Sequence, residues 1–473
     1  MPASPTDLYT VEPMTHTALT AIKRVTERTR MPSEQNEHQK GTNGAKKTLK
    51  FLFVALEPLS GDLAWQLTKE GHAVKMFIKG NDAYGDTYDG FVEKVPEWKT
   101  HIDWADVIVF DDTGFGTHAD TLRKEGKLVV GGSSYTDRLE EDREFGQEEM
   151  KRVGMLTLPH WDFADYDEAV EFIRKNPGRY VFKPSGNVSS DWKSLLFIST
   201  EEDGKDLIEI LASNKVVLAK KIKQFQLQKF VAGVEIAVSA FFNGEQFLHP
   251  VFVNFEHKRL FPGDIGPMTG EMGTLAFWSD SNPFFKATLE RMEGSLKGSG
   301  YVGVIDINCI VNGRGIYPLE FTCRFGYPTI SVQIEGVTNE WGEFLAAIAR
   351  HEPYQLKTKH GFQIGIVCTV PPFPYADKSE LELYRDSSIL FKRPNPEGIH
   401  LGDVKLVDGV WRVAGDVGYV LVVTGSGVTV SETRKQAYGR IEDIMLQNMF
   451  YRTDIGLGWG EASDKLQTWG YLH

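Results

Sequence analysis

The chain has 473 residues, enough for roughly three domains at about 100–200 residues each. Its hydrophobic content of 41% and charged content of 25% are typical of a globular protein, and its net charge of −13 argues against nucleic-acid binding, which usually needs a basic face. No apolar run approaches the roughly 18 residues that span a membrane, and the cysteines form no CxxC pair, so we expect reduced thiols, no membrane partner and a cytoplasmic location.

Residues 1–48 differ from the rest of the chain. They are rich in Thr, Pro, Ser, Asn and Lys and poor in apolar residues, which predicts a disordered extension. The stretch THTALTAIKRVTERTR within it has some helical periodicity and several basic residues, so a transit peptide is the alternative. Glu12 and Glu27 count against a transit peptide, and we favour a solvated tail.

Residues 49–148 alternate between apolar runs and helical segments. The apolar runs are LKFLFVALEP (49–58), AVKMFIKG (73–80), ADVIVFDDTGFG (105–116) and KLVVGGS (127–133). Helical spacing between a possible N-cap at Ser60 and the glycine at Gly71 predicts a helix after the first run. Buried strands that alternate with helices predict a doubly wound, Rossmann-like N-terminal domain.

The pattern changes after residue 149. Asn-Gly turns at 243–244 and 312–313 predict hairpins, and we expect helices over 283–298 and 339–352. Residues 362–455 are rich in strand patterns and should end in a helix over 431–450. We therefore predict a mixed α/β and α+β multidomain protein, with further domains at 149–355 and 356–473.

Four oxygen-bearing side chains are predicted to meet on the hairpin with the second Asn-Gly turn. Asp306 and Asn308 share a face of one arm, as do Glu320 and Thr322 on the other arm. Because Mg²⁺ takes oxygen ligands, this pattern indicates a metal site. Arg324 continues the face of Glu320 and would suit a phosphate. A solvated polar hairpin face explains the same pattern equally well.

Two charged residues lie among apolar neighbours. Lys183 ends the apolar strand YVFKPSG, where its ammonium would bind a phosphate as a point charge, unless it simply reaches out to solvent. Glu235 lies in AGVEIAV, so we expect it to be partly buried and to need hydrogen-bond partners. A ribose hydroxyl pair and a structural donor would serve equally well.

The segment HKRLFPGDIGPMTGEMG (257–273) places two cations next to a run rich in glycine. Glycines beside a Lys-Arg pair indicate backbone held close to an anionic ligand. A glycine-rich hairpin without chemistry would look similar.

These segments, in this order, resemble the glycinamide ribonucleotide synthetase (phosphoribosylamine–glycine ligase) family of the ATP-grasp superfamily. That family carries HKR-x(4)-D-x-GPNTGGMG, EFN-x-RFGDPE and F-L-x-G-x-E, which are similar here to 257–273, EFTCRFGYPT (320–329) and FVAGVEIA (230–237). Segments at 63–67, 130–146 and 418–456 are also similar, so the likeness covers about residues 49–456.

The resemblance implies a Rossmann-like first domain, an ATP-grasp core and a small β-rich C-terminal domain. It also implies an enzyme that uses ATP and Mg²⁺ (or Mn²⁺) to join a carboxylate to an amine through an acyl phosphate, with phosphoribosylamine and glycine as the first substrate pair and purine biosynthesis as the setting. The partners would be small-molecule substrates, in a monomer or small homo-oligomer. The implied site residues are Lys183, Gln228, Lys229, Phe230, Glu235 and Lys258 for ATP, Arg324, Asp264 and Arg259 for catalysis, Gly266, Thr269, Gly270, Met272 and Gly273 for the substrate, and Glu320, Asn308, Asp306 and Thr322 for the metal.

The sequence departs from the family pattern at several of these places. Thr322 replaces a metal-binding Asn, Gln147 stands where many relatives have an ATP-contacting Lys, and Glu271 replaces a Gly of the substrate loop. The segment EPLS, which starts at Glu57, replaces a glycine-rich phosphate-binding turn and would suit a cationic or neutral amine better than a phosphorylated one. Two alternatives therefore stay open: a related ligase with a different carboxylate and amine, and a non-catalytic nucleotide-binding homologue.

Overall fold

The computed structural model describes residues 47–79, 85–185, 195–280, 282–375, 378–394 and 396–472. The extension predicted over residues 1–48 therefore lies outside the described residues, except for its last two. No helix in these described ranges is long and apolar enough to cross a membrane.

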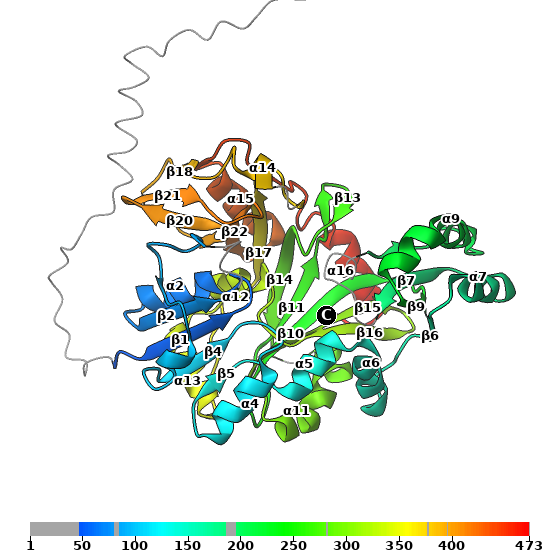
Figure 1. Cartoon of the computed structure of the whole chain (residues 1–473), viewed down its shortest axis with the longest axis horizontal. Helices are drawn as coiled ribbons and strands as arrows, with labels where there is room; N and C mark the ends of the chain where they lie inside the picture. The colour runs from blue at the N-terminus through cyan, green and yellow to red at the C-terminus, as the bar shows by residue number, and fades with distance from the viewer. Residues whose placement is uncertain are drawn as a thin grey trace, which may run out of the picture.

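The first sheet is parallel, as the alternating pattern of residues 49–148 predicts, and its order is β3-β2-β1-β4-β5 (Figure 1). Its strands are β1 (Lys50–Ala55), β2 (Ala73–Ile78), β3 (Glu93–Lys94), β4 (Val107–Phe110) and β5 (Val129–Val130). The helices of this region are α2 (Gly61–Lys69), η1 (Lys99–His101), α4 (Gly116–Lys124) and α5 (Ser134–Glu141). Because β1 and β4 are neighbours, the acidic segments that follow them, at Glu57 and at Asp111–Asp112, meet at the carboxyl edge of the sheet.

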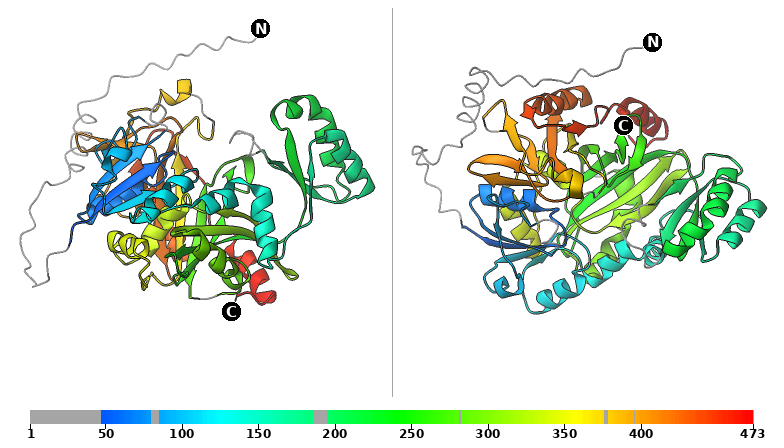
Figure 2. Two further views of the ribbon diagram at one scale, coloured as in Figure 1. Left: turned by 60° about the horizontal axis from the view of Figure 1, so that its bottom comes forward. Right: turned by 45° about the horizontal axis from the view of Figure 1, so that its top comes forward.

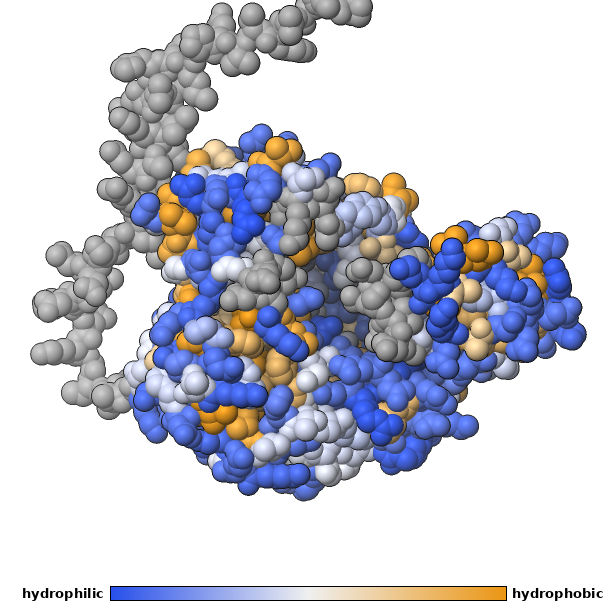
Figure 3. All heavy atoms as spheres, viewed as in Figure 1, coloured by the Kyte–Doolittle hydropathy of each residue, from blue (hydrophilic) through white to orange (hydrophobic). Residues whose placement is uncertain are grey.

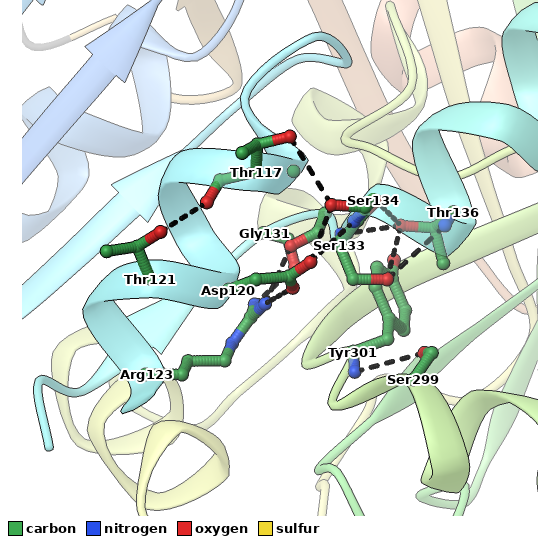
Figure 4. Close-up of polar contacts among 12 residues, drawn as sticks. Thr117, Asp120, Thr121, Arg123, Gly131, Ser133, Ser134, Thr136, Ser299 and Tyr301 are labelled. Carbon is green, nitrogen blue, oxygen red and sulfur yellow. Dashed lines mark hydrogen bonds and ion pairs between the residues drawn. The ribbon is translucent and has the colours of Figure 1, made fainter. Parts of the chain in front are cut away.

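The turn after β5 is held by polar contacts that Figure 4 shows. The guanidinium of Arg123 donates to the carbonyl oxygens of Gly131 (2.7 Å) and Gly132 (2.8 Å). Ser133 caps α5 through a capping box with Thr136. These contacts fix the helix whose last residues, Glu140 and Glu141, line the cleft described below.

A small lobe follows α6 (Arg143–Arg152) and has a core of its own. Its antiparallel sheet, in the order β6-β9-β7-β8, is packed against two helices. These elements are β6 (His160–Phe163), α7 (Tyr166–Lys175), β7 (Tyr180–Ser185), β8 (Phe197–Ile198), α9 (Lys205–Lys221) and β9 (Gln224–Lys229). The lobe projects to one side of the main body in both views of Figure 2.

The main body is built on an antiparallel sheet in the order β16-β15-β10-β11-β14-β17-β22-β19, with β24 paired to β17. Its strands are β10 (Val234–Phe242), β11 (Val251–Glu256), β14 (Gly273–Ser279), β15 (Gly303–Asn312), β16 (Gly315–Thr322), β17 (Phe362–Thr369), β19 (Ile399–Leu401), β22 (Tyr419–Gly427) and β24 (Phe450–Tyr451). The β14–β17 pairing carries this sheet across the predicted boundary at residues 355 and 356, so part of the C-terminal region extends the core sheet. The domain boundaries themselves stay a prediction.

Two smaller sheets complete the body. One is the hairpin of β12 (Arg259–Phe261) and β13 (Ile265–Met268), and the other has the order β20-β21-β18-β23. The strands of the second sheet are β18 (Ser388–Phe391), β20 (Val404–Val407), β21 (Val410–Val413) and β23 (Ile444–Met445). The remaining helices are α10 (Pro283–Ala287), η2 (Leu289–Met292), α11 (Glu293–Ser299), α12 (Thr329–Gly336), α13 (Trp341–Ala349), α14 (Lys378–Leu381), α15 (Val430–Ile441) and α16 (Trp459–Thr468).

Three local expectations are wrong in detail. The helix expected over 283–298 is broken at Thr288, whose φ of −126° and ψ of −97° are not helical. The helix expected over 431–450 ends at Ile441, because Ile444 and Met445 pair with β18 instead. Ser60 stands at the N-cap of α2, but its hydroxyl donates to Asp111 Oδ2 (2.7 Å) and not to the helix backbone.

Candidate active site

A cleft of about 650 Å³ lies between the small lobe and the main body. Figure 3 shows a hollow near the centre of this face of the molecule, with the small lobe projecting beside it. Helices α5 and α6 line one side of the cleft, strands β6, β7 and β9 of the lobe line another, and β16 contributes Glu320. The polar lining includes Glu140, Glu141, Arg143, Gln147, Gln226 and Glu320.

Four residues predicted for nucleotide or metal binding come together beside this cleft, and one of them, Glu320, lines it. Lys183 on β7 interacts electrostatically with Glu320, Lys258 and Glu235, which the fold brings from β16, from the segment after β11 and from β10. Burial, then repulsion by the cations Arg143 and Lys258, lowers the pKa of Lys183 to about 8. A buried ammonium in this state favours an anionic ligand, because an anion would stabilise its charged form.

For Glu320 and Lys258, nearby opposite charges outweigh burial, so the charged form of each side chain is favoured. Although burial opposes the charge of Glu320, the cations Lys183 and Arg143 lower the pKa of its carboxyl, and Arg143 lies 3.6 Å from Oε2. Lys258 Nζ lies 3.1 Å from both Glu235 and Glu256, and these carboxylates raise its pKa well above the usual range despite burial. The cluster therefore holds both signs of charge before any ligand binds.

Glu235 is more exposed than predicted. Its side chain is 44% accessible, although its neighbours Val234 and Ile236 are buried. The alternation of the strand explains the difference, because Glu235 points to the face opposite its neighbours and meets Lys258 there.

The four predicted metal ligands face each other across the β15–β16 hairpin, with Asp306 opposite Thr322 and Asn308 opposite Glu320. The hydroxyl of Ser239 donates to Asp306 Oδ2, and burial followed by the charge of Glu256 raises the pKa of Asp306 to about 8.

Within the part of the chain that the structure describes, no three His, Cys, Asp or Glu side chains are grouped to hold a metal by themselves. Mg²⁺ is commonly bound by one or two carboxylates together with substrate phosphates. The oxygen-rich donor set of this hairpin fits that kind of shared coordination, and the metal role of these residues stays a prediction.

Arg324 is held by acidic residues of the first domain. Its Nε lies 3.1 Å from Glu140 Oε1 and 3.4 Å from Asp112 Oδ1. Glu140 also accepts a hydrogen bond from the backbone N–H of Cys323 (2.6 Å). Burial, then the nearby Asp112, raises the pKa of Glu57. Arg324, which we predict to bind phosphate, therefore has several carboxyl groups around its single positive charge.

The predicted catalytic residues of the β12–β13 hairpin use their side chains to build the hairpin itself. Asp264 adopts a positive φ of 54° and its Oδ1 accepts a hydrogen bond from Arg452 (2.8 Å). Arg259 donates to the carbonyl oxygen of Gly266 (2.7 Å), which has a φ of 86° that favours glycine.

The loop residues predicted to bind substrate differ in how tightly they are packed. Thr269 closes the loop by donating its N–H and hydroxyl to the carbonyl oxygen of Lys258, at 2.9 and 2.6 Å. Met272 is buried, and a Cβ on Gly273 would come within 2.7 Å of Gly365 O. A Cβ on Gly270, by contrast, would meet no atom within 4 Å. The loop therefore combines tightly packed positions with one uncrowded position at Gly270.

The residues predicted near the adenine lie at the end of β9. Gln228 is buried, Lys229 lies over the ring of Tyr180 (4.7 Å), and the guanidinium of Arg179 stacks on Phe230 (3.7 Å). Their nucleotide contacts stay a prediction. Nearby, the side-chain amides of Gln147 and Gln226 hydrogen-bond each other at 3.0 Å (either can donate). 

Sequence reasoning missed several residues of this site. Glu256, which pairs with Lys258 and accepts from Asn308 Nδ2 (2.9 Å), stands directly before the HKR segment and could have been found there. Glu140 on α5 and Arg143 on α6 lie in the matched segment 130–146, but nothing in it indicated that they meet Arg324 and Glu320. Arg452 lies in FYRTDIG, a segment already matched to the family, but nothing in it indicated that this arginine holds the substrate loop.

Comparison with known proteins agrees with this architecture. Residues 141–330 match the family model described as phosphoribosylglycinamide synthetase, ATP-grasp (A) domain. The phosphoribosylamine–glycine ligase of Streptococcus pneumoniae R6 is 26% identical over 431 residues, which covers 86% of this chain and 99% of that protein. The corresponding ligase of Clostridium acetobutylicum is 22% identical over 435 residues, with the same coverage.

Solved structures show the same fold. The crystal structure of phosphoribosylamine–glycine ligase from Thermotoga maritima aligns with a TM-score of 0.66 at 22% identity, over 86% of this chain and 100% of that one. A Campylobacter jejuni biotin carboxylase in a β-γ-ATP complex aligns with a TM-score of 0.57 at 12% identity, over 89% of this chain and 97% of that one. The predicted resemblance is confirmed: residues 141–330 match the ATP-grasp domain of phosphoribosylglycinamide synthetase, and the chain as a whole has the fold of the Thermotoga maritima phosphoribosylamine–glycine ligase.

Proposed function

We propose that this protein is an ATP-dependent carboxylate–amine ligase that acts through an acyl phosphate. The observation that supports this most directly is the cluster of Lys183, Lys258, Glu320 and Asp306 beside the cleft. The names of the relatives make phosphoribosylamine and glycine the first substrate pair to test, with a role in purine biosynthesis. A cytoplasmic location and a monomeric or small homo-oligomeric state stay predictions.

The reaction divides into two balanced steps. A carboxylate oxygen attacks the γ-phosphorus of ATP, which forms the acyl phosphate and releases ADP. The amine nitrogen then attacks the acyl carbon, phosphate leaves, and the nitrogen loses a proton. Lys183 and Lys258 would bind the phosphates and compensate their charge, since positioning and charge neutralisation carry such transfers. Glu320 and Asp306 would hold Mg²⁺ or Mn²⁺, which supplies further neutralisation of the phosphate oxygens when bound.

Hydroxylamine allows the first step to be tested without knowing the natural amine, because it traps an acyl phosphate as a hydroxamate. We expect hydroxamate and ADP to form with ATP, Mg²⁺ and glycine. Glu320→Ala should abolish both products, whereas Asp306→Ala should raise the Mg²⁺ concentration needed for half-maximal activity if the acid on β15 compensates for Thr322. The exposed Glu245, which pairs with Lys297, provides the control Glu245→Gln.

Two results would count against this function. Tight ATP binding without ADP release for any carboxylate would favour the non-catalytic homologue. An unchanged Mg²⁺ dependence in Asp306→Ala would remove Asp306 from the metal site while leaving the ligase assignment intact.

A second candidate differs only in the amine. Glu57, Asp112 and Glu140 surround Arg324 with carboxylates where a phosphorylated amine would approach the first domain. This charge favours a ligase for a cationic or neutral amine. Product formation from phosphoribosylamine, compared with amines that lack a phosphate, decides between the two candidates once hydroxamate formation is established.

A further inference from the structure

The substrate loop contains a buried carboxylate with an unused acceptor. Glu271 is 6% exposed, and its Oε1 has no hydrogen-bond partner among the residues that the structure describes. The next residue, Met272, donates its N–H to the carbonyl oxygen of His257 (2.7 Å), which places Glu271 beside the Lys258 segment. A buried acceptor without a partner costs about 1–3 kcal/mol, and more when it is charged, so its presence needs an explanation.

The surroundings of Glu271 identify the kind of ligand it would take. Its carboxyl interacts electrostatically with Glu256, Lys258 and Asp306, which belong to the charged cluster described above, and through a hydrogen bond with Thr274. Lys258 is already paired with Glu235 and Glu256, both at 3.1 Å, and Glu271 forms no ion pair with any residue in the described ranges. Burial, then Glu256, raises the pKa of Glu271 well above its usual range, and a bound cation would restore the charged form.

Tyr419 contributes a donor on another side. It interacts electrostatically with Glu271, and its buried hydroxyl also has no hydrogen-bond partner in the described ranges. Its ring packs between Tyr327 and Phe373, with centroids at 5.8 and 6.0 Å. A buried carboxyl oxygen and a buried hydroxyl, both without a partner among the described residues, therefore lie near each other, since Tyr419 packs against the cluster that holds Met272. This pair suits a small ligand that carries both a cation and an oxygen acceptor.

We propose that Glu271 is a specificity-determining residue that binds the ammonium group of an α-amino-carboxylate substrate. This inference rests on the proposed function. In such a substrate one carbon separates the ammonium from the carboxylate, so an ammonium on Glu271 keeps the carboxylate within reach of Lys258, the cation that interacts with Glu271. Simple carboxylates that lack an amino group would leave Glu271 unpaired and would bind more weakly.

The test compares glycine with glycolate, in which a hydroxyl replaces the ammonium. With hydroxylamine as the trap, wild-type protein should prefer glycine over glycolate in kcat/KM. Glu271→Gln should lower this preference by about 30-fold or more, the range expected when one partner of a buried charged pair is removed. The loss should lie mainly in the KM of glycine, because Glu271 does not touch the reacting carboxylate.

Binding provides a readout that does not depend on turnover. Glycine should raise the unfolding temperature of the wild-type protein with bound nucleotide, and this shift should be absent in Glu271→Gln and retained in the control Glu245→Gln. If Glu271→Gln keeps the glycine preference and the shift, the inference is wrong while the ligase function stands. If wild-type protein accepts only carboxylates without an ammonium, the inference is equally wrong. If glycine shifts the unfolding temperature only when Glu271 is present, yet no carboxylate gives ADP, the inference survives and the ligase function fails.

Discussion

At the scale of single residues, Lys183 shows how the fold prepares the cleft for an anion. The strand pattern of YVFKPSG places this ammonium in a buried position, where the protein holds it beside Arg143 and Lys258. Glu320 and Glu235 offset only part of the combined effect of burial and of this repulsion, so the pKa of Lys183 falls to about 8. Polyphosphate binding would relieve this conflict, which is a physical reason for a lysine at such a place.

The lowered pKa makes ATP binding sensitive to pH. Lys183 of the free protein loses its proton as the pH rises through about 8, so ATP affinity should fall above that value, approaching tenfold per pH unit. Lys183→Arg should remove this decline, because arginine stays charged over the whole range. The dissociation constant of ATP, measured by calorimetry from about pH 6.5 to 9.5, checks the prediction. The exposed pair partner Lys297 supplies the control Lys297→Arg, and an equal decline in Lys183→Arg would refute the assignment.

At the scale of elements, the β12–β13 hairpin depends on an arginine from a distant part of the chain. The side chain of Arg452 is 1% exposed and donates to Asp264 (2.8 Å), to both oxygens of Asp454 (2.8 and 2.7 Å) and to the carbonyl oxygen of Arg259 (2.9 Å). Asp454 in turn accepts from the N–H of Gly263 (2.9 Å). The C-terminal segment therefore anchors the substrate loop.

Replacing Arg452 should disturb the substrate loop without affecting nucleotide binding. Arg452→Met leaves Asp454 and the carbonyl oxygen of Arg259 without their donor, whereas water can reach Asp264, which is 70% exposed. It should cost about 1–3 kcal/mol of stability, the range for buried acceptors left unpaired. We expect the KM of the carboxylate to rise while the dissociation constant of ATP stays unchanged, and limited proteolysis to cleave within the hairpin. Arg393→Met, at an arginine that is 79% exposed, is the control. Equal losses of ATP and carboxylate affinity would contradict an effect confined to the loop.

The sequence predicted elements well where the pattern is local. The β15–β16 hairpin follows from alternation and an Asn-Gly turn, and its cross-strand pairs bring Asp306 and Glu320 to one face as expected. The β14–β17 pairing could not be predicted, because the sequence of neither strand indicates which other strand it pairs with. Nor could the carboxylates around Arg324, since Asp112 and Glu140 reach it only through the docking of the first domain.

At the scale of the whole molecule, a buried polar chain joins the first domain to the C-terminal strands. Asp62 on α2 accepts from the N–H of Leu401 (3.0 Å) and lies 2.7 Å from His400 Nδ1. His400 Nε2 lies 2.9 Å from Thr424 Oγ1, which donates to Glu335 Oε2 (3.0 Å). Because α5, which lines one side of the cleft, belongs to the first domain, these hydrogen bonds help to fix that side against the rest of the site.

Glu335, at the far end of this series of hydrogen bonds, should control the stability of the protein in acid. Glu335 is buried, yet Arg440 (3.2 Å) and Lys359 (2.8 Å) lower its pKa from 4.5 to about 2. A depressed carboxyl pKa stabilises the fold above the unfolded value and loses that effect as the pH falls through the folded value, here between about pH 4.5 and about pH 2. The shift corresponds to about 3 kcal/mol at neutral pH.

Glu335→Gln should therefore be less stable than wild type in urea at about pH 7, and most of the difference should vanish by about pH 3. Glu245→Gln controls for loss of an exposed carboxylate. A difference between Glu335→Gln and wild type that does not change with pH would show that Glu335 acts by packing and not by its charge.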